Sequence, residues 1–127
     1  MDMLIDSFIQ REIDSLDMDS NIAAVELALR ETRHTFVPVN DRDNKCFGVI
    51  SSMDLIDFRA SGANPHTVKA WEICSHKIVK VESTISVREA AQLMLDHEIH
   101  HLLVCDDGEL AGIISTLDVI KTLMLKR

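Results

Sequence analysis

The sequence predicts a mixed α/β protein built from two successive β-α-β-β-α repeats. The strongest observation is internal: the segment Gly48–Ile56 (GVISSMDLI) returns as Gly112–Ile120 (GIISTLDVI), 64 residues later. Within each repeat, amphipathic helical spacing alternates with short β-branched runs bounded by turn residues. Two repeats are too few for a solenoid, and half of this sheet is too small to be stable alone. We therefore expect the repeats to pack face to face as a pseudo-two-fold pair.

The second repeat shows its elements most clearly. A β-branched strand is expected at Ile78–Val81, and the capping-box pattern Ser86-Val87-Arg88-Glu89 then opens a helix. Apolar residues recur at i, i+3, i+4, i+7 and i+8 from Val87 to Leu95, as in an amphipathic helix. Strands at Leu102–Cys105 and Leu110–Ser115 flank a hairpin turn, Asp106-Asp107-Gly108-Glu109. A closing helix is marked by Leu117, Ile120, Leu123 and Met124.

The first repeat follows the same order. Asp19 or Ser20 is expected to cap a helix that turns Ile22, Val25 and Leu29 inward. Strands are expected near Phe36–Val39 and Cys46–Ile50, followed by a helix near Met53–Phe58. The domain boundaries predicted on this basis are residues 1–58 for the first repeat, 59–69 for a linker with Gly62 and Pro65, and 70–127 for the second repeat.

Composition excludes several classes of function. The formal net charge is −8, so the chain is a poor general binder of nucleic acid or of an anionic membrane. No apolar run approaches the ~18 residues of a membrane span, and the first residues lack the basic start of a secretory signal. The three cysteines form no C-x-x-C pair, which argues against a disulfide framework. We expect a cytoplasmic protein.

The duplicated segment carries the candidate site. Ser51 and Asp54, and likewise Ser115 and Asp118, follow a strand and open a helix. The N–H groups and the dipole at a helix N-terminus suit a phosphate, and a carboxylate accepts well from the hydroxyls of a ribose. The same S-x-x-D spacing is also a capping box. Both interpretations, ligand site and helix cap, are open from the spacing.

These motifs resemble those of a known family. A G-h-h-S-x-x-D stretch after a hairpin, the helix E-A-A-x-x-M at Glu89–Met94 and the strand Val37-Pro38-Val39 are similar to CBS domains, which are named for cystathionine β-synthase. The resemblance covers roughly Ile5–Phe58 and Val68–Leu123. It implies a CBS pair with two clefts between its halves, commonly assembled as a homodimer. Such pairs often bind adenine nucleotides or related adenosyl compounds and regulate a partner protein, and they are rarely enzymes.

The resemblance also implies roles for individual residues. In the family the serine of the motif meets a phosphate and the aspartate meets a ribose. Basic residues before the second strand, as in the gamma subunit of AMP-activated kinase, meet phosphates, and backbone and apolar contacts line the adenine pocket. The positions carried over are Ser51, Asp54, Ser115 and Asp118; His100 and His101, with His101 in place of an arginine; Arg33, His34 and Thr35; and Lys77 and Ile78.

The role that the resemblance implies for the two histidines can be tested by the pH dependence of ligand affinity. If they meet a phosphate, ligand affinity should rise as the pH falls from about 8 to about 6, where an ordinary histidine titrates. On general grounds the same pair could equally be exposed residues at a strand edge.

Three functions are consistent with these features. The first is a non-enzymatic regulatory protein that senses AMP, ADP, ATP or an S-adenosylmethionine-like ligand and signals to a partner or dimer mate, with no catalytic residue, metal or required cofactor. The second is a dimerisation or interaction module with empty clefts. The third is remote: His97-Glu98-Ile99-His100-His101 fits the H-E-x-x-H pattern of zinc hydrolases, which requires both histidines on one helical face.

Overall fold

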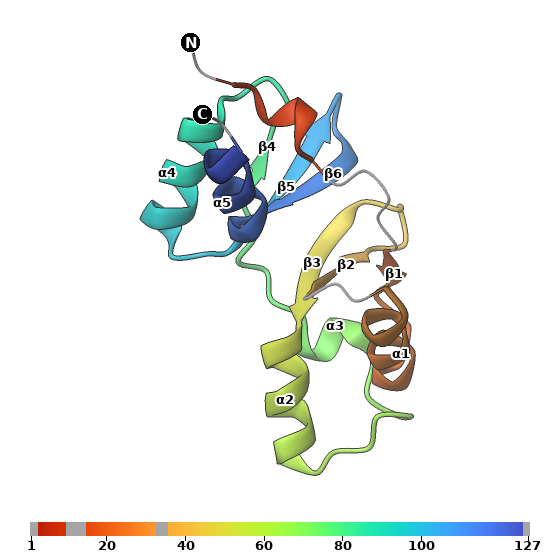
Figure 1. The fold of residues 1–127 in the computed structure, drawn as a ribbon. Coiled ribbons are helices and arrows are strands. Elements are labelled where there is room, and N and C mark those ends of the chain that lie inside the picture. Colours follow the sequence, from red (N-terminus) through yellow and green to blue (C-terminus); the bar gives the residue numbers. More distant parts are fainter. Residues whose placement is uncertain (1–2, 10–14, 33–35, 126–127) are drawn as a thin grey trace. The chain divides into compact units, whose positions relative to one another are not determined.

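The computed structural model describes residues 3–9, 15–32 and 36–125 of the chain (Figure 1). Its contacts divide the chain into two compact units. One contains the described residues of Met1–Ile13 and Val79–Arg127, and the other contains those of Asp14–Ile78. Each unit holds a three-stranded sheet with helices, which confirms the predicted mixed α/β class.

The unit of Asp14–Ile78 contains the elements of the first repeat. Its sheet has the strand order β1-β2-β3, with β1 parallel to β2 and β2 antiparallel to β3. The register pairs Val37 with Ile50 and shifts between Val39 and Asn40, where the turn to β3 begins. The elements are β1 (Leu16–Asp17), α1 (Ile22–Thr32), β2 (Phe36–Asn40), β3 (Cys46–Ser51), α2 (Ser52–Ser61) and α3 (Ala70–Ile73).

The second unit repeats this plan with the strand order β4-β5-β6. Antiparallel β5 and β6 meet at a tight turn in which Asp107 and Gly108 both have positive φ, 54° and 81°. Two left-handed residues give the turn the twist that a hairpin needs, which explains the Asp-Gly signal in the sequence. The elements are η1 (Ile5–Ser7), β4 (Lys80–Val81), α4 (Val87–His97), β5 (His101–Asp106), β6 (Glu109–Ser115) and α5 (Thr116–Leu125).

The helix starts largely follow the predicted capping signals. The Ser86 hydroxyl accepts the Glu89 N–H at 3.0 Å, so the capping box of α4 is present. For α1 the predicted cap is wrong. The cap is Asn21, whose Oδ1 accepts the Ala24 N–H at 2.9 Å. Asp19 instead pairs with Arg42 at 3.3 Å, because the β2–β3 turn brings a guanidinium to it.

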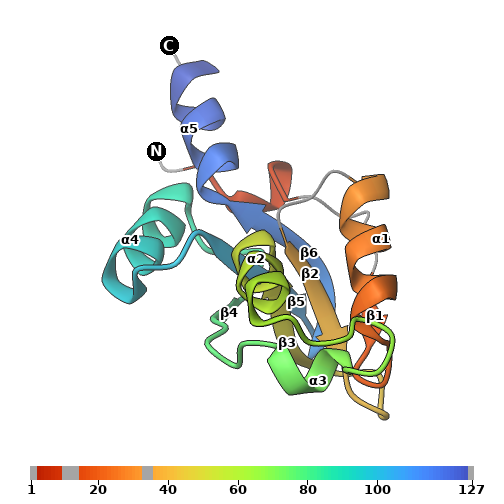
Figure 2. The same ribbon diagram turned by 90° about the horizontal axis from the view of Figure 1, so that it is seen from below.

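The segments that lead into the two repeats are exchanged between the units. Ile5 is fully buried in the core of the β4–β6 unit, and its N–H donates to the Ile85 carbonyl at 3.0 Å. In the other unit Ala70 of α3 is fully buried, and its N–H donates to the Ser20 carbonyl at 2.7 Å. Accordingly η1 lies beside the sheet of the second repeat and α3 lies close to β3 (Figures 1 and 2). Each sequence repeat thus completes its core with a segment that precedes the other repeat.

The closing helix is present as α5, and its apolar residues are divided between two faces. Val119 and Thr122 are buried against the unit's core. The four residues that mark the helix in the sequence, Leu117, Ile120, Leu123 and Met124, are all at least half exposed. Among the described residues, no helix is both long enough and apolar enough to cross a membrane.

Candidate functional site

The β3–α2 junction holds the first Ser–Asp pair. Ser51 is the N-cap of α2, and its hydroxyl oxygen accepts the Asp54 N–H at 3.2 Å. The carboxylate reaches back, and its Oδ2 accepts the Ser51 N–H at 2.8 Å and the Ser51 hydroxyl at 3.0 Å. These reciprocal bonds make a complete capping box, so the helix-cap interpretation of the motif is correct here.

The β6–α5 junction reproduces this arrangement. The Ser115 hydroxyl oxygen accepts the Asp118 N–H at 3.1 Å, and Asp118 Oδ2 accepts both the Ser115 N–H and its hydroxyl at 2.9 Å. The agreement follows from the sequence repeat, because each motif places a serine at the last strand residue and an aspartate three residues later. The chain therefore builds the same local arrangement twice.

The cap leaves a specific set of groups for a ligand. In each junction only Oδ2 of the aspartate is engaged, and Oδ1 accepts no hydrogen bond from the described residues. The single hydroxyl proton of each serine is donated to the aspartate, so it is not available to a phosphate in this arrangement. At α5 the Thr116 N–H also donates to the His100 carbonyl, at 2.9 Å. The junction therefore offers a carboxylate acceptor more readily than an anion site.

His101 lies next to the second junction. It opens β5, and the antiparallel register pairs it with Ser115. Burial, reinforced by the nearby His100, lowers the pKa of His101 from 6.5 to about 4, although Asp118 acts in the opposite direction. His101 is therefore neutral near pH 7. In the ligand-free chain His101 therefore does not titrate between pH 8 and 6, where an ordinary histidine does, and the predicted rise of ligand affinity in that range stays a prediction.

This pKa predicts a pH dependence of stability. In the unfolded chain His101 becomes protonated below its ordinary pKa of 6.5, whereas in the folded chain it becomes protonated only near its lowered pKa of about 4. Unfolding should therefore become easier as the pH falls through this window, by about 1–2 kcal/mol for a half-buried ring. Urea titrations at pH 7 and pH 5 should show a smaller loss of stability in His101→Gln than in the unchanged chain. The exposed His66→Gln is the control, and an equal loss in all three proteins would contradict the prediction.

At the β6–α5 junction the structure brings together four of the predicted site residues: His100, His101, Ser115 and Asp118. His100 is exposed and contributes its carbonyl to the α5 N-terminus. Lys77 and Ile78 belong to the other unit, where the Lys77 N–H donates to the Ser75 hydroxyl oxygen at 3.1 Å and the Ile78 N–H to the His76 carbonyl at 2.9 Å. Arg33, His34 and Thr35 lie outside the described residues.

The H-E-x-x-H stretch does not have the geometry that a zinc hydrolase needs. Helix α4 ends at His97, and Glu98 adopts a left-handed conformation with φ 53° as the C-cap. His101 already belongs to β5. The two histidines therefore do not lie one turn apart on a helix. Within the described ranges, no group of three or more His, Cys, Asp or Glu residues is placed to hold a metal ion.

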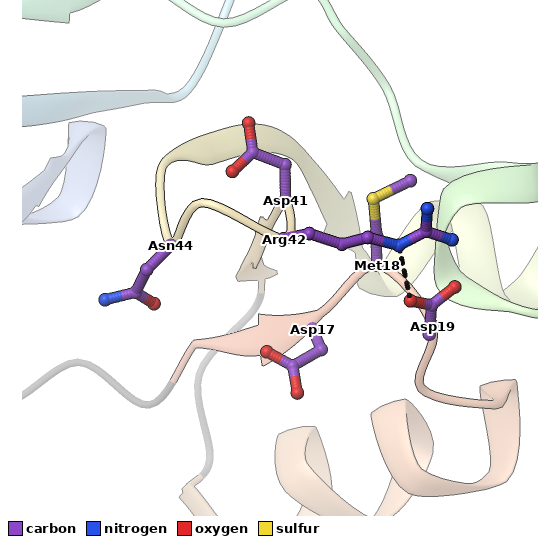
Figure 3. Close-up of a pocket in the computed structure, with 6 residues that line it drawn as sticks. All are labelled: Asp17, Met18, Asp19, Asp41, Arg42 and Asn44. Atoms are coloured by element: carbon purple, nitrogen blue, oxygen red, sulfur yellow. Dashed lines mark hydrogen bonds and ion pairs between the residues drawn. The ribbon is translucent and has the colours of Figure 1, made fainter.

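The β1–β3 unit has a shallow cavity that was not predicted from the sequence (Figure 3). It has a volume of about 250 Å³ and lies between the end of β1 and the β2–β3 turn. Figure 3 shows Arg42 extended from this turn towards Asp19. Asp41 is used by the turn itself, because its Oδ1 accepts the N–H groups of Asp43 and Lys45. The signal in the sequence that could have indicated this cavity is the group of acidic residues that flank β1 and β2.

Comparison with known proteins identifies the family. The model of the CBS domain matches twice, over residues 5–61 and 70–125. These two segments cover most of the chain and coincide with the repeats found in the sequence. The chain belongs to the CBS domain family.

The individual relatives described here have low sequence identity to the chain. Hypoxic response protein 1 of Mycobacterium tuberculosis is 25% identical over 103 residues, which are 80% of this chain and 72% of that protein. A crystal structure of Hypoxic Response Protein I with two coordinated zinc ions has a TM-score of 0.81 at 19% identity, with 94% and 98% of the two chains covered.

Two further solved structures share the fold. The CBS domain pair of protein MJ0100, in complex with 5′-methylthioadenosine and S-adenosyl-L-methionine, has a TM-score of 0.89 at 19% identity over the full length of both chains. The CBS-domain protein ATU1752 of Agrobacterium tumefaciens has a TM-score of 0.85 at 22% identity, covering 97% of this chain and 95% of that one.

Proposed function

We propose that this chain is a non-enzymatic regulatory CBS protein that senses an adenosyl ligand and signals to a partner or dimer mate. The observation that carries the proposal is the duplicated junction. Ser51 with Asp54, and Ser115 with Asp118, have the same hydrogen bonds at the start of two ten-residue helices. The complex of the MJ0100 pair with two adenosyl compounds supports this ligand class.

The chemistry available at each junction fits the ribose part of such a ligand. A carboxylate can accept from the two vicinal hydroxyls of a ribose, and Oδ1 of each aspartate is the oxygen not used by the cap. In the second repeat His101 stands beside Ser115 as a neutral ring that can donate from one nitrogen and accept at the other. We assign Asp54 and Asp118 to the ribose, with AMP, ADP, ATP and S-adenosylmethionine as candidate ligands.

A thermal-shift screen tests this proposal. AMP, ADP, ATP, S-adenosylmethionine and a dinucleotide are each added at millimolar concentration. A ligand that binds only the folded chain adds ~2.7 kcal/mol at 100 times its Kd, which corresponds to a rise in Tm of roughly 5–15 °C for a chain of this size. If none of these compounds raises Tm by even about 1 °C, the sensor proposal is wrong and the empty module described next replaces it.

The second candidate is a ligand-free dimerisation module. It is favoured by exposed apolar side chains on two helices, Met53 and Ile56 on α2 and Leu117 and Ile120 on α5. Large apolar groups grouped on a helix surface are typical of interaction sites. We propose a homodimer for both candidates, and it would have twice the 14.3 kDa mass of the chain.

The cysteines support a cytoplasmic location. Cys46, Cys74 and Cys105 form no disulfide with one another. Burial raises the pKa of Cys74 and that of Cys105, which keeps these two thiols protonated and poorly reactive. Half-buried, unreactive thiols suit a reducing compartment.

A further inference from the structure

The backbone donors at the β6–α5 junction are largely used by the chain itself. The Ser115 N–H donates to Asp118 Oδ2 at 2.9 Å, and the Asp118 N–H donates to the Ser115 hydroxyl oxygen at 3.1 Å. The Thr116 N–H donates to the His100 carbonyl at 2.9 Å. An anion site at a helix N-terminus needs such N–H groups to point at the ligand. Three of the four N–H groups from Ser115 to Asp118 are therefore already engaged by acceptors of the chain.

The side chains of the junction do not replace these donors with a positive charge. The Ser115 hydroxyl donates its proton to Asp118 at 2.9 Å. His101, which the strand register pairs with Ser115, is half-buried and neutral near pH 7. Lys121 lies one turn further along α5 and is exposed, so water and salt screen its charge. A phosphate at this junction would therefore lie beside the Asp118 carboxylate, and His101 would not balance its charge.

A ribose makes no such demand on the junction. Asp118 Oδ1 accepts no hydrogen bond from the described residues, and a carboxylate oxygen accepts well from a hydroxyl. A nucleoside carries no charge that the protein has to neutralise. A neutral thioether or a sulfonium cation on its 5′ carbon does not need anion donors either, and the cation would be attracted by Asp118.

We propose that the β6–α5 junction selects an adenosyl ligand without a phosphate, and that His101 is the residue that determines this selection. The inference rests on the proposed ribose site at Asp118 and narrows its ligand class to adenosine and its 5′-thioether and sulfonium derivatives. It concerns this junction alone, because Arg33, His34 and Thr35 of the first repeat lie outside the described residues.

Adenosine and AMP are the matched probes, because they differ only by the phosphate. Every protein in the experiment carries Asp54→Asn, which removes the carboxylate of the first junction and keeps an amide oxygen that can accept the Ser51 N–H. Calorimetry at pH 7 should give a Kd for AMP at least about tenfold higher than that for adenosine, because like charges at a site disfavour binding. Adding Asp118→Ala should abolish most of the adenosine binding, and undiminished binding would place the ligand elsewhere and overturn the proposal.

His101→Arg tests the role of His101 directly. An arginine beside Ser115 supplies the positive charge and the planar donors that a phosphate requires. It should lower the Kd for AMP by about tenfold or more relative to that for adenosine. His66→Arg is the matched control, because it adds the same charge at an exposed position of the other unit and should leave the AMP-to-adenosine ratio within about threefold. Circular dichroism verifies that both variants are folded.

The salt dependence of AMP binding gives a second measurement that does not depend on the folding of His101→Arg. Between about 0.01 M and about 1 M NaCl the Debye length falls from ~30 to ~3 Å. If the phosphate is repelled by Asp118, AMP affinity should rise with added salt while adenosine affinity changes little. A fall in AMP affinity would reveal an attracting cation and would contradict the proposal.

The outcomes separate this inference from the proposed function. If adenosine, 5′-methylthioadenosine, S-adenosylmethionine and AMP all fail to bind, the adenosyl sensor is contradicted, and the selection with it. If AMP binds as tightly as adenosine, only the selection is contradicted, and the adenosyl function stands. If folded His101→Arg leaves the AMP-to-adenosine ratio unchanged, His101 does not determine the selection.

Discussion

Replacing Ile5 with alanine is expected to lower the free energy of unfolding by about 3 kcal/mol, as is usual for a large side chain removed from a well-packed core. Ile5 has no exposed surface, and it belongs to the cluster that includes Val87, Met94 and Ile114. The backbone just before Ile5 is fixed as well, because the Val87 N–H donates to the Met3 carbonyl at 2.7 Å. The side chain therefore leaves a cavity that its surroundings cannot easily close.

The matched control is the neighbouring residue. Leu4 is 49% exposed and loses little buried area on truncation, so Leu4→Ala should cost less than about 1 kcal/mol. Urea titrations followed by far-ultraviolet circular dichroism give both values. Equal losses in the two variants would contradict the assignment of Ile5 to the core of the second repeat.

The packing of Ile5 into the core of the second repeat could not be predicted from the sequence. The order of elements along each repeat and the capping boxes at Ser51, Ser86 and Ser115 are encoded by residues close together in the chain, and the structure has them. The destination of the segment at Ile5 depends on contacts with residues about 80 positions away, at Ile85 and Val87. Periodicity indicates which residues share a face, but it does not indicate what that face packs against.

Contacts between residues distant in the sequence also explain why the cap of α1 and the exposed face of α5 were not predicted. The cap of α1 was predicted at Asp19 or Ser20 because those residue types favour caps, but tertiary contacts engage both. The Asp19 carboxylate pairs with Arg42, the Ser20 backbone carbonyl accepts the Ala70 N–H, and α1 begins at Ile22, so Asn21 occupies the cap position. Leu117 and Ile120 form an apolar stripe that is exposed in the structure, a property that only the packing of α5 reveals.

The candidate site was predictable to a similar extent. The Ser–Asp bonds join residues three apart, so the motif predicts them directly. The neutral state of His101 depends on burial by residues that are distant in sequence, and no local pattern reports it. The assignment of phosphate to the serine hydroxyls came from the family resemblance. In the structure each serine hydroxyl already donates its proton to the aspartate, so a phosphate could accept it only after that bond is broken.

Asp118→Ala is expected to weaken binding of the adenosyl ligand by about 10- to 150-fold, because a charged acceptor for the ribose hydroxyls contributes ~1.5–3 kcal/mol. It also removes half of the α5 capping box, which should cost about 1 kcal/mol of stability. Asp54→Ala removes the same cap bonds from α2 and should cost as much stability. Its effect on binding should be smaller, because His100 and His101 lie beside the second junction.

Isothermal titration calorimetry at pH 7 on a ligand identified by the thermal-shift screen measures these effects. Asp118→Asn is the variant that separates the two roles of the carboxylate, since its amide oxygen can still accept the Ser115 N–H while the charge is lost. We expect it to recover most of the stability and little of the affinity. The His100→Ala/His101→Ala double variant completes the set, and it should weaken binding without removing a hydrogen bond of the capping box.

Equal Kd values for the unchanged chain, Asp118→Ala and the double histidine variant would show that the ligand binds elsewhere. Equal losses at Asp54 and Asp118 would show instead that the two junctions are equivalent and that the histidines contribute nothing, because the cap bonds are the same in both repeats.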